Sequence, residues 1–251
     1  MLKKNKERRS IKENLLLAAT TASASGITNV ASVIAFFAFT SNVTGHVAIF
    51  AEEVVKGHWH QVYIVLVWLL LFLFGAFLAN YLISSIAKKG RYLSHAAPVF
   101  IEILVLSVIA IYGHYYYEET LRETECLVGG LLFCMGLQNS MVSTISGGVV
   151  KTTHVTGLFT DLGAELSQWL HPITPRSKVL KERLTLRFTV LGFYIIGGLV
   201  GGWFFLKYDF LAFFLVILIL IFVVYYDMTR VITKLTIRKI KKPAYVVQEQ
   251  N

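Results

Sequence analysis

Amide side chains that could bind a polar solute stand in two otherwise apolar stretches of this 251-residue chain. The first stretch contains Asn29 within a run of small and hydroxyl-bearing residues, and the second contains Gln138 and Asn139 within a similar run. Amides are costly in hydrocarbon unless they are paired, so each is either an interhelical hydrogen-bonding group or a ligand for a solute. For any one residue alone, hydrogen bonding between helices is the better interpretation. The occurrence of the pattern in two places favours a binding site.

A Thr-Gly pair follows each polar stretch, Thr44-Gly45 in the first case and Thr156-Gly157 in the second. A helix can break at glycine and expose its backbone groups. We therefore expect a helix, an unwound turn and then a short re-entrant or interfacial helix in each place. The start of such a short helix carries a partial positive charge that could hold an anion. A capped turn at the membrane surface is the plainer alternative.

Glu102 is the one carboxylate expected inside a membrane-spanning stretch, a few residues after Pro98. An acidic group at that depth should face protein or water, and it could bind a proton or a cation. The alternative is a structural partnership with Lys88, Lys89 or Arg91 near the membrane face. The sequence favours neither interpretation over the other.

Support for catalysis is weak, because the chain lacks the spacings HExxH, GxSxG, GxxxxGK[ST] and GxGxxG. His46 and His154 flank the two Thr-Gly turns and are interpreted as amphipathic surface residues. Cys126 and Cys134 have no metal-binding or disulfide-framework spacing and are interpreted as packing residues. We expect a protein that is not an enzyme and that has no cofactor and no metal site.

The composition indicates that the elements carrying these residues lie in a membrane. Hydrophobic residues make up 55% of the chain and charged residues 16%, with a mean hydropathy of +0.62. Soluble domains contain about a quarter charged residues, so membrane lipid must cover much of this surface. The net charge of +9 would suggest a nucleic-acid partner in a soluble protein. Here the cations gather in alternate loops, and no nucleic-acid partner is expected.

Six apolar stretches approach or exceed the length of about 20 residues that crosses the hydrocarbon of a membrane. The two chain ends and the connections expected on the same side as them carry 21 of the 24 Lys and Arg residues. The connections expected on the other side carry 3. Positive charges concentrate on the cytoplasmic side of membrane proteins, so both termini are expected to be cytoplasmic. The expected spans are 15–40, 61–87, 97–117, 127–150, 186–206 and 209–229.

An internal repeat links the first and fourth of these spans. The residues at 26–29 (GITN) precede the first Thr-Gly pair, and those at 136–139 (GLQN) precede the second. Residues 73–80 also match 195–202, with small residues four apart in both. The repeat unit therefore has three spans, and an odd number requires the second copy to enter the membrane from the opposite side. Many secondary transporters have such inverted halves, although an old duplication retained for packing would leave the same pattern.

The residues of these motifs resemble a known family. The segments Met135–Ser140, Thr152–Leu158 and Ser41–Gly45 resemble the YoaK family of bacterial inner-membrane proteins, which is defined as domain of unknown function 1275. The likeness covers nearly the whole chain, and GLQN followed by the TTxxTG block is its most specific part. The resemblance implies six helices in a bacterial cytoplasmic membrane, and it implies no substrate.

These observations predict an all-α membrane protein with six transmembrane helices in two inverted three-helix repeats, and with broken or re-entrant segments after helices 1 and 4. The expected parts are a basic cytoplasmic N-terminus (1–14), a first repeat (15–117), an extracellular acidic loop (118–126), a second repeat (127–229) and a basic cytoplasmic tail (230–251).

The expected function is that of a small secondary transporter or channel for a small polar or anionic solute. A homodimer is a further expectation. The alternative is a non-transporting membrane scaffold or partner-binding subunit, in which the polar helices only pack. The expected solute-binding residues are Asn29, Thr44, Gly45, Gln138, Asn139, Thr156 and Gly157, with Glu102 as a proton or cation site.

Overall fold

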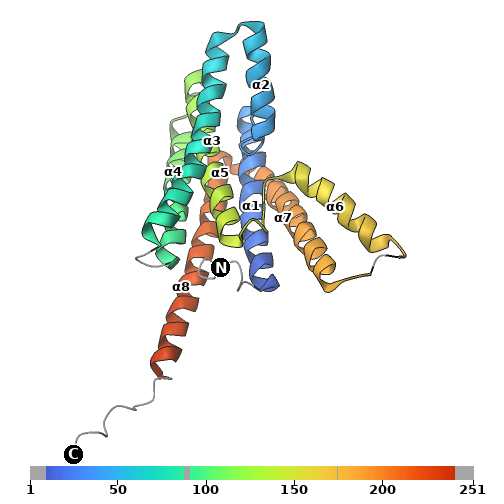
Figure 1. Ribbon diagram of the computed structural model, residues 1–251. Helices are drawn as coiled ribbons and strands as arrows, with labels where there is room; N and C mark the ends of the chain where they lie inside the picture. Colours follow the sequence, from blue (N-terminus) through green and yellow to red (C-terminus); the bar gives the residue numbers. More distant parts are fainter. Residues whose placement is uncertain (1–9, 88–90, 174, 241–251) are drawn as a thin grey trace, which may run out of the picture.

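The structure is a computed structural model that describes residues 10–87, 91–173 and 175–240, with side chains for all of these except Arg91 and residues 227–240. Every element in these ranges is helical (Figure 1). Lys88, Lys89 and much of the basic chain ends lie outside the described residues. The elements are α1 (Ile11–Phe36), α2 (Val43–Lys56), α3 (Trp59–Ile86), α4 (Arg91–Tyr115), α5 (Leu121–Ser146), α6 (Val155–Leu170), α7 (Lys178–Tyr208), the 3-10 turn η2 (Asp209–Ala212) and α8 (Phe213–Ile240).

Five helical segments in the described part of the chain are long and apolar enough to cross a membrane. Four of them are α1, α3, α5 and most of α4, and the fifth is the 49-residue stretch Lys178–Tyr226, which includes α7, η2 and the start of α8. The shorter helices α2 and α6 are not among them. The described ranges therefore have the architecture of an all-helical membrane protein.

Helices α1 and α5 form the centre of the protein. In the most apolar 18-residue stretch of each of these helices, 67% is buried within the protein, against 17% in the same kind of stretch of α3. These stretches of the central helices are also less apolar than that of α3. Their mean hydropathy is 1.2 in α1 and 1.4 in α5, against 2.7 in α3. A helix that is surrounded by protein can carry polar groups that lipid would not tolerate, so the polar stretches lie in the interior.

Side-chain caps determine where several helices begin. In α1, the Ser10 hydroxyl accepts a hydrogen bond from the Glu13 backbone N–H, and the Glu13 carboxylate accepts one from the Ser10 backbone N–H. Thr120 and Glu123 form the same reciprocal capping box at α5. This cap starts α5 at Leu121, so the acidic loop expected at 118–126 is shorter and its last residues belong to the helix.

The most extensive helix packing among the described residues is in two pairs, α1 with α7 and α3 with α5. In each pair, glycines on both helices face a carbonyl oxygen of the partner, and any added Cβ atom would overlap that oxygen. Small residues allow such approaches between membrane helices. The contacts are Gly26 with the Tyr194 carbonyl, Gly197 with the Ser23 carbonyl, Gly136 with the Phe72 carbonyl and Gly75 with the Phe133 carbonyl.

The long helices alternate in direction. In the view of Figure 1, α1, α4 and α7 run upward, whereas α3, α5 and α8 run downward. Helix α2 extends above α1 at the top of the molecule in this view. Helix α6 slopes downward to the right of α7, in the lower half of the molecule (Figure 1). The two short helices therefore lie toward opposite ends of the bundle.

The breaks after the two central helices lie before the Thr-Gly pairs, and not at them. Phe37, which directly follows α1, has φ 53°, and Gly147 and Gly148, which directly follow α5, have φ 64° and 81°. Helices α2 and α6 then begin at Val43 and Val155, so that Thr-Gly occupies the first helical turn in both places. The left-handed conformation at the helix ends, which favours glycine, is what terminates α5.

Candidate functional site

Asn29 connects α1 to two other parts of the protein. Its Nδ2 donates a hydrogen bond to the Tyr194 hydroxyl on α7 at 2.8 Å. Its Oδ1 accepts from the Thr40 backbone N–H at 2.9 Å and from the Ser41 hydroxyl at 3.2 Å. The side chain is nearly buried, with 8% of its surface exposed. Asn29 thus holds the α1–α2 connection against the α1–α7 pair, which is a structural role.

Asn139 has the corresponding arrangement on α5, with fewer contacts. Its Oδ1 accepts a hydrogen bond from the Thr153 hydroxyl at 2.8 Å, and Thr153 belongs to the connection that leads into α6. Each Asn is therefore hydrogen-bonded to a hydroxyl of the connection that follows its own helix. No hydrogen bond links Asn29 with Asn139 in the ranges that the structure covers. The polar contact between α1 and α5 is made by the neighbouring side chains Ser25 and Gln138.

Gln138 is the amide of α5 that contacts α1. The side chain is fully buried, and the Ser25 hydroxyl of α1 donates to its Oε1 at 3.0 Å. The same hydroxyl is 2.9 Å from the Thr21 carbonyl oxygen, and its single proton can serve only one of the two acceptors. If the amide is rotated by 180°, Nε2 donates to Ser25 and Oε1 is left over. In either orientation one polar atom of Gln138 has no partner among the described residues.

Thr28 adds a second unpartnered polar atom to this region. It lies one helical turn beyond Ser25 on α1, and its hydroxyl is fully buried and forms no hydrogen bond within the described part of the chain. Residues three apart share a helix face, so Thr28 continues the face that contacts α5. A buried polar group without a partner is destabilising by about 1–3 kcal/mol. The crossing of α1 and α5 therefore contains polar capacity that the protein itself does not use.

Glu102 is fully buried in α4, and neither carboxylate oxygen has a hydrogen-bond partner among the residues described. The Cys134 thiol of α5 is also buried and lies within electrostatic range of it. The structural partners expected from sequence were Lys88, Lys89 and Arg91; the first two lie outside the described residues, and the Arg91 side chain is not described. A buried, unpaired carboxylate must bind a proton, a cation or water.

The Thr-Gly pairs lie at the exposed starts of α2 and α6. Thr44 and Thr156 are exposed. The Asn42 side chain caps α2 by accepting from the Gly45 backbone N–H at 3.1 Å, and a Cβ atom at Gly45 would be 2.6 Å from that side chain. Gly157 likewise leaves room for the side chain of His154. These glycines make room for the residue before the helix.

His46 is buried, with 4% of its surface exposed, contrary to the interpretation of it as a surface residue. Its Nε2 is 2.6 Å from the Phe39 carbonyl oxygen, and its ring meets the edge of Trp68 on α3 at 5.6 Å. Together these contacts link the start of α2 to the α1–α2 connection and to α3. The sequence gives no signal for this role, because the partners are a backbone carbonyl and a distant ring.

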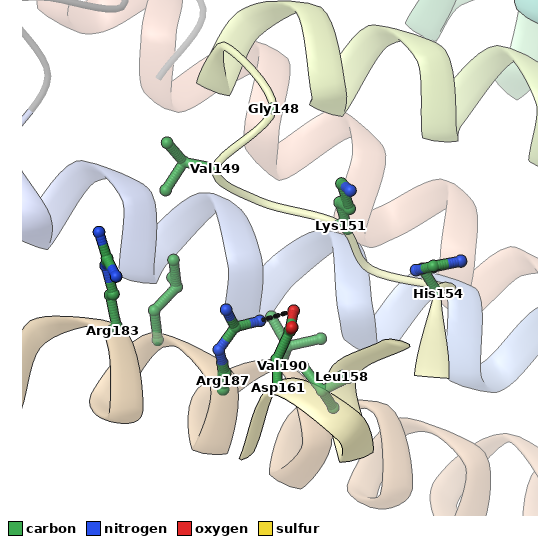
Figure 2. A pocket seen from close by; sticks show the side chains of 10 residues that line it. Gly148, Val149, Lys151, His154, Leu158, Asp161, Arg183, Arg187 and Val190 are labelled. Carbon is green, nitrogen blue, oxygen red and sulfur yellow. Dashed lines mark ion pairs between the residues drawn. The ribbon is translucent and has the colours of Figure 1, made fainter. Parts of the chain in front are cut away.

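A polar pocket beside α6 was also missed in the sequence. It has a volume of about 270 Å³ and lies between the α5–α6 connection, α6 and α7 (Figure 2). The Arg187 guanidinium contacts Asp161 through Nη1 at 2.7 Å and Glu165 through Nε at 2.7 Å and Nη2 at 3.0 Å. Asp161 and Glu165 are four residues apart on α6, and this spacing is the signal that a cation would lie between them.

Residues 17–226 match the model of a family described as "protein of unknown function (DUF1275)". The chain belongs to the DUF1275 family. This finding confirms the resemblance noted from GLQN and TTxxTG. No curated protein and no solved structure matches the chain.

Proposed function

We propose that this DUF1275 protein is a small secondary transporter or channel that moves a small polar or anionic solute across a bacterial inner membrane. Its solute site lies where α1 crosses α5. The observation that carries the proposal is the pair of unpartnered, buried polar side chains Thr28 and Gln138 at this crossing. A solute that hydrogen-bonds to both would supply the partners that the protein lacks.

The long apolar segment Lys178–Tyr226 supports a six-span architecture. As one helix, its 49 residues would be about 74 Å long, whereas the hydrocarbon layer is about 30 Å thick. The 3-10 turn η2 interrupts the segment, and Asp209 at its start has φ 50°. The segment is long enough for two spans with a turn between them, which brings the total to six.

The glycine contacts support two inverted halves. The α1 positions Ser23 and Gly26 correspond, 110 residues later, to Phe133 and Gly136 on α5. The contacted α3 positions correspond to the α7 positions 122 residues later, which relates Phe72 to Tyr194 and Gly75 to Gly197. Each of the four backbone contacts therefore has a counterpart in the other half. Central helices that run in opposite directions (Figure 1) are what an inverted repeat requires.

The same correspondence relates Thr28 to Gln138. These residues are 110 positions apart, and both leave a buried polar atom unpaired. In inverted-repeat transporters the site lies near the midplane at the interface of the halves. We assign Gln138 as the central solute ligand and Glu102 as a proton or cation site nearby. Asn29 and Asn139 position the two connections, and the exposed Thr-Gly turns lie at the two ends of the pathway.

A membrane scaffold is the second candidate, and the Asn29 contacts favour it. Both ends of this amide are occupied by protein groups, which is what a purely structural residue requires. Under the scaffold hypothesis, no ligand binds the unpartnered atoms of Thr28 and Gln138, and these atoms only reduce the stability of the protein. The two hypotheses therefore differ in what happens when those atoms are removed.

The discriminating experiment combines thermal unfolding with uptake into proteoliposomes. A screen of small polar and anionic solutes should find one that raises the melting midpoint of the parent protein by mass action. Thr28→Val removes an unpartnered hydroxyl and should keep or raise the midpoint without solute, yet it should abolish the stabilisation by solute and the uptake. Gln138→Leu should also abolish both, because it removes the central ligand.

Asn80→Leu is the matched control. Asn80 is an interhelical amide that bonds Ser140 and Thr144 of α5 at 2.6 Å, away from the α1–α5 crossing. It should lose stability by about 0.6 kcal/mol per hydrogen bond and retain the response to solute. If no solute shifts the parent, or if Thr28→Val responds to solute as the parent does, the transporter proposal is wrong and the scaffold remains.

A further inference from the structure

The pocket beside α6 combines four basic side chains in one cavity. Lys151 and His154 come from the α5–α6 connection, and Arg183 and Arg187 come from α7 (Figure 2). A volume of about 270 Å³ is far above the minimum of about 10–15 Å³ that one water molecule needs. The cavity therefore has room for an oxyanion together with some of its water.

The charges around the cavity do not balance. Arg187 is paired with Asp161 and Glu165, but neither Lys151 nor Arg183 forms an ion pair or hydrogen bond with a residue that the structure describes. Taken together, these three cations and two carboxylates sum to +1. An exposed lysine alone would be an ordinary solvated residue, but here two unpaired cations line the same cavity. One negative charge would neutralise the group.

Arg187 already pairs with a carboxylate inside this cavity. Glu165 holds one edge of the guanidinium through two hydrogen bonds, and its side chain is only 8% exposed. The remaining nitrogen, Nη1, contacts the carboxylate of Asp161, which lines the cavity and is 54% exposed. The buried carboxylate fixes the orientation of the guanidinium. The exposed carboxylate occupies the position that a ligand would take.

The start of α6 adds to the attraction for an anion. The corresponding helix α2 is capped by the side chain of Asn42, whereas His154 at the start of α6 forms no such hydrogen bond. The first N–H groups of α6 are therefore not capped by a side chain, and they favour negative charge nearby. This contrast distinguishes the two otherwise similar Thr-Gly turns.

We propose that this pocket binds a singly charged phosphate group, held by Lys151 and Arg183, in competition with Asp161 for Nη1 of Arg187. The ligand is either free inorganic phosphate or the phosphodiester of an anionic lipid headgroup. The site is separate from the α1–α5 crossing, and it does not depend on whether the protein transports a solute.

The test uses the full-length protein and two probes, which distinguish the two sources. In the first arm, lipid-depleted protein in detergent is titrated with inorganic phosphate, against potassium chloride at equal ionic strength, and the melting midpoint is followed. In the second arm, the protein is placed in nanodiscs of phosphatidylcholine with or without phosphatidylglycerol. A saturable shift with phosphate identifies a free anion, and a shift with phosphatidylglycerol alone identifies a lipid headgroup.

Lys151→Gln and Arg183→Gln are the diagnostic variants, and Lys178→Gln is the matched control. Lys178 is at the start of α7 and does not line the pocket. Each diagnostic variant should lower the affinity for the probe that shifts the parent, by up to about fivefold, since one exposed charge contact contributes at most about 1 kcal/mol. Lys178→Gln should leave the affinity unchanged. Asp161→Asn should strengthen binding, because it removes the competing carboxylate.

Several results would overturn the proposal. One is that neither phosphate nor phosphatidylglycerol changes the melting midpoint of the parent protein relative to its chloride or phosphatidylcholine control. Another is that Lys178→Gln weakens binding as much as Lys151→Gln, which would show that only general surface charge matters. A third is that Asp161→Asn weakens binding. All four substituted residues are exposed, so folding should be retained.

Discussion

Adding one methyl group at Gly26 should separate the α1–α7 pair, and the size of the effect can be estimated from the contacts. The new Cβ of Gly26→Ala would overlap the Tyr194 carbonyl oxygen and would lie 2.9 Å from the Gly198 nitrogen. Both are backbone atoms that cannot rotate away, so the cost should be near the upper end of the range of about 1–3 kcal/mol for overpacking. Alanine returns about 1 kcal/mol through its helix propensity. The net loss is about 2 kcal/mol.

Gly192→Ala is the matched control on α7. A Cβ atom there meets no other atom within 4 Å, so only the helix-propensity gain of about 1 kcal/mol remains. For a chain of this size, 1 kcal/mol corresponds to about 2–4 °C in the melting midpoint. Thermal unfolding in detergent should therefore show Gly26→Ala lower by about 4–8 °C and Gly192→Ala higher by up to about 4 °C.

The counterpart position tests the correspondence between the halves. Gly136→Ala should lower the midpoint by an amount similar to Gly26→Ala, because its Cβ would overlap the Phe72 carbonyl oxygen. If Gly26→Ala melts at or above the parent temperature, α1 and α7 do not approach as described. If the losses in melting midpoint of the two variants differ widely, the two glycine contacts are not equivalent.

Two further predictions concern the buried polar groups. Glu102→Gln should melt no lower than the parent in a thermal-shift measurement, because its carboxylate has no hydrogen bond to lose among the described residues; a drop of several degrees would reveal a structural partner. Asn29→Leu should be clearly more destabilising than Asn139→Leu, because it leaves the buried Thr40 N–H unpaired, at about 1–3 kcal/mol. Equal losses in the same measurement would contradict the structural role of Asn29.

Hydrophobicity alone located most of the fold. Each apolar stretch expected to cross the membrane overlaps a helix, because a lipid-covered helix needs a long apolar surface whatever its neighbours are. The helix ends were less predictable. Thr120 and Glu123 start α5 earlier than hydropathy indicated, since a capping box depends on two specific polar residues and not on apolar content.

The candidate site was only partly predictable, because its contacts join residues far apart in the chain. The polar stretches identified Gln138 and Asn29 as interior residues, which is confirmed by their burial. Sequence spacing could not show that the Asn29 amide donates a hydrogen bond to Tyr194. It also could not show that one polar atom of Gln138 lacks a partner among the described residues. For the same reason, the cations of the α6 pocket looked like ordinary positive charges of a cytoplasmic loop.

The most direct test of the central claim is the sidedness of the two short helices. Val55 at the end of α2 is 87% exposed and Ile173 after α6 is 85% exposed, so cysteines placed there should react readily. Each would be introduced singly into a chain in which Cys126 and Cys134 are replaced by Ser and Ala. An inverted repeat predicts that, in intact cells, an impermeant thiol reagent labels Val55→Cys and reaches Ile173→Cys only after lysis. Labelling of both positions from the same side would contradict the inversion and the solute site derived from it.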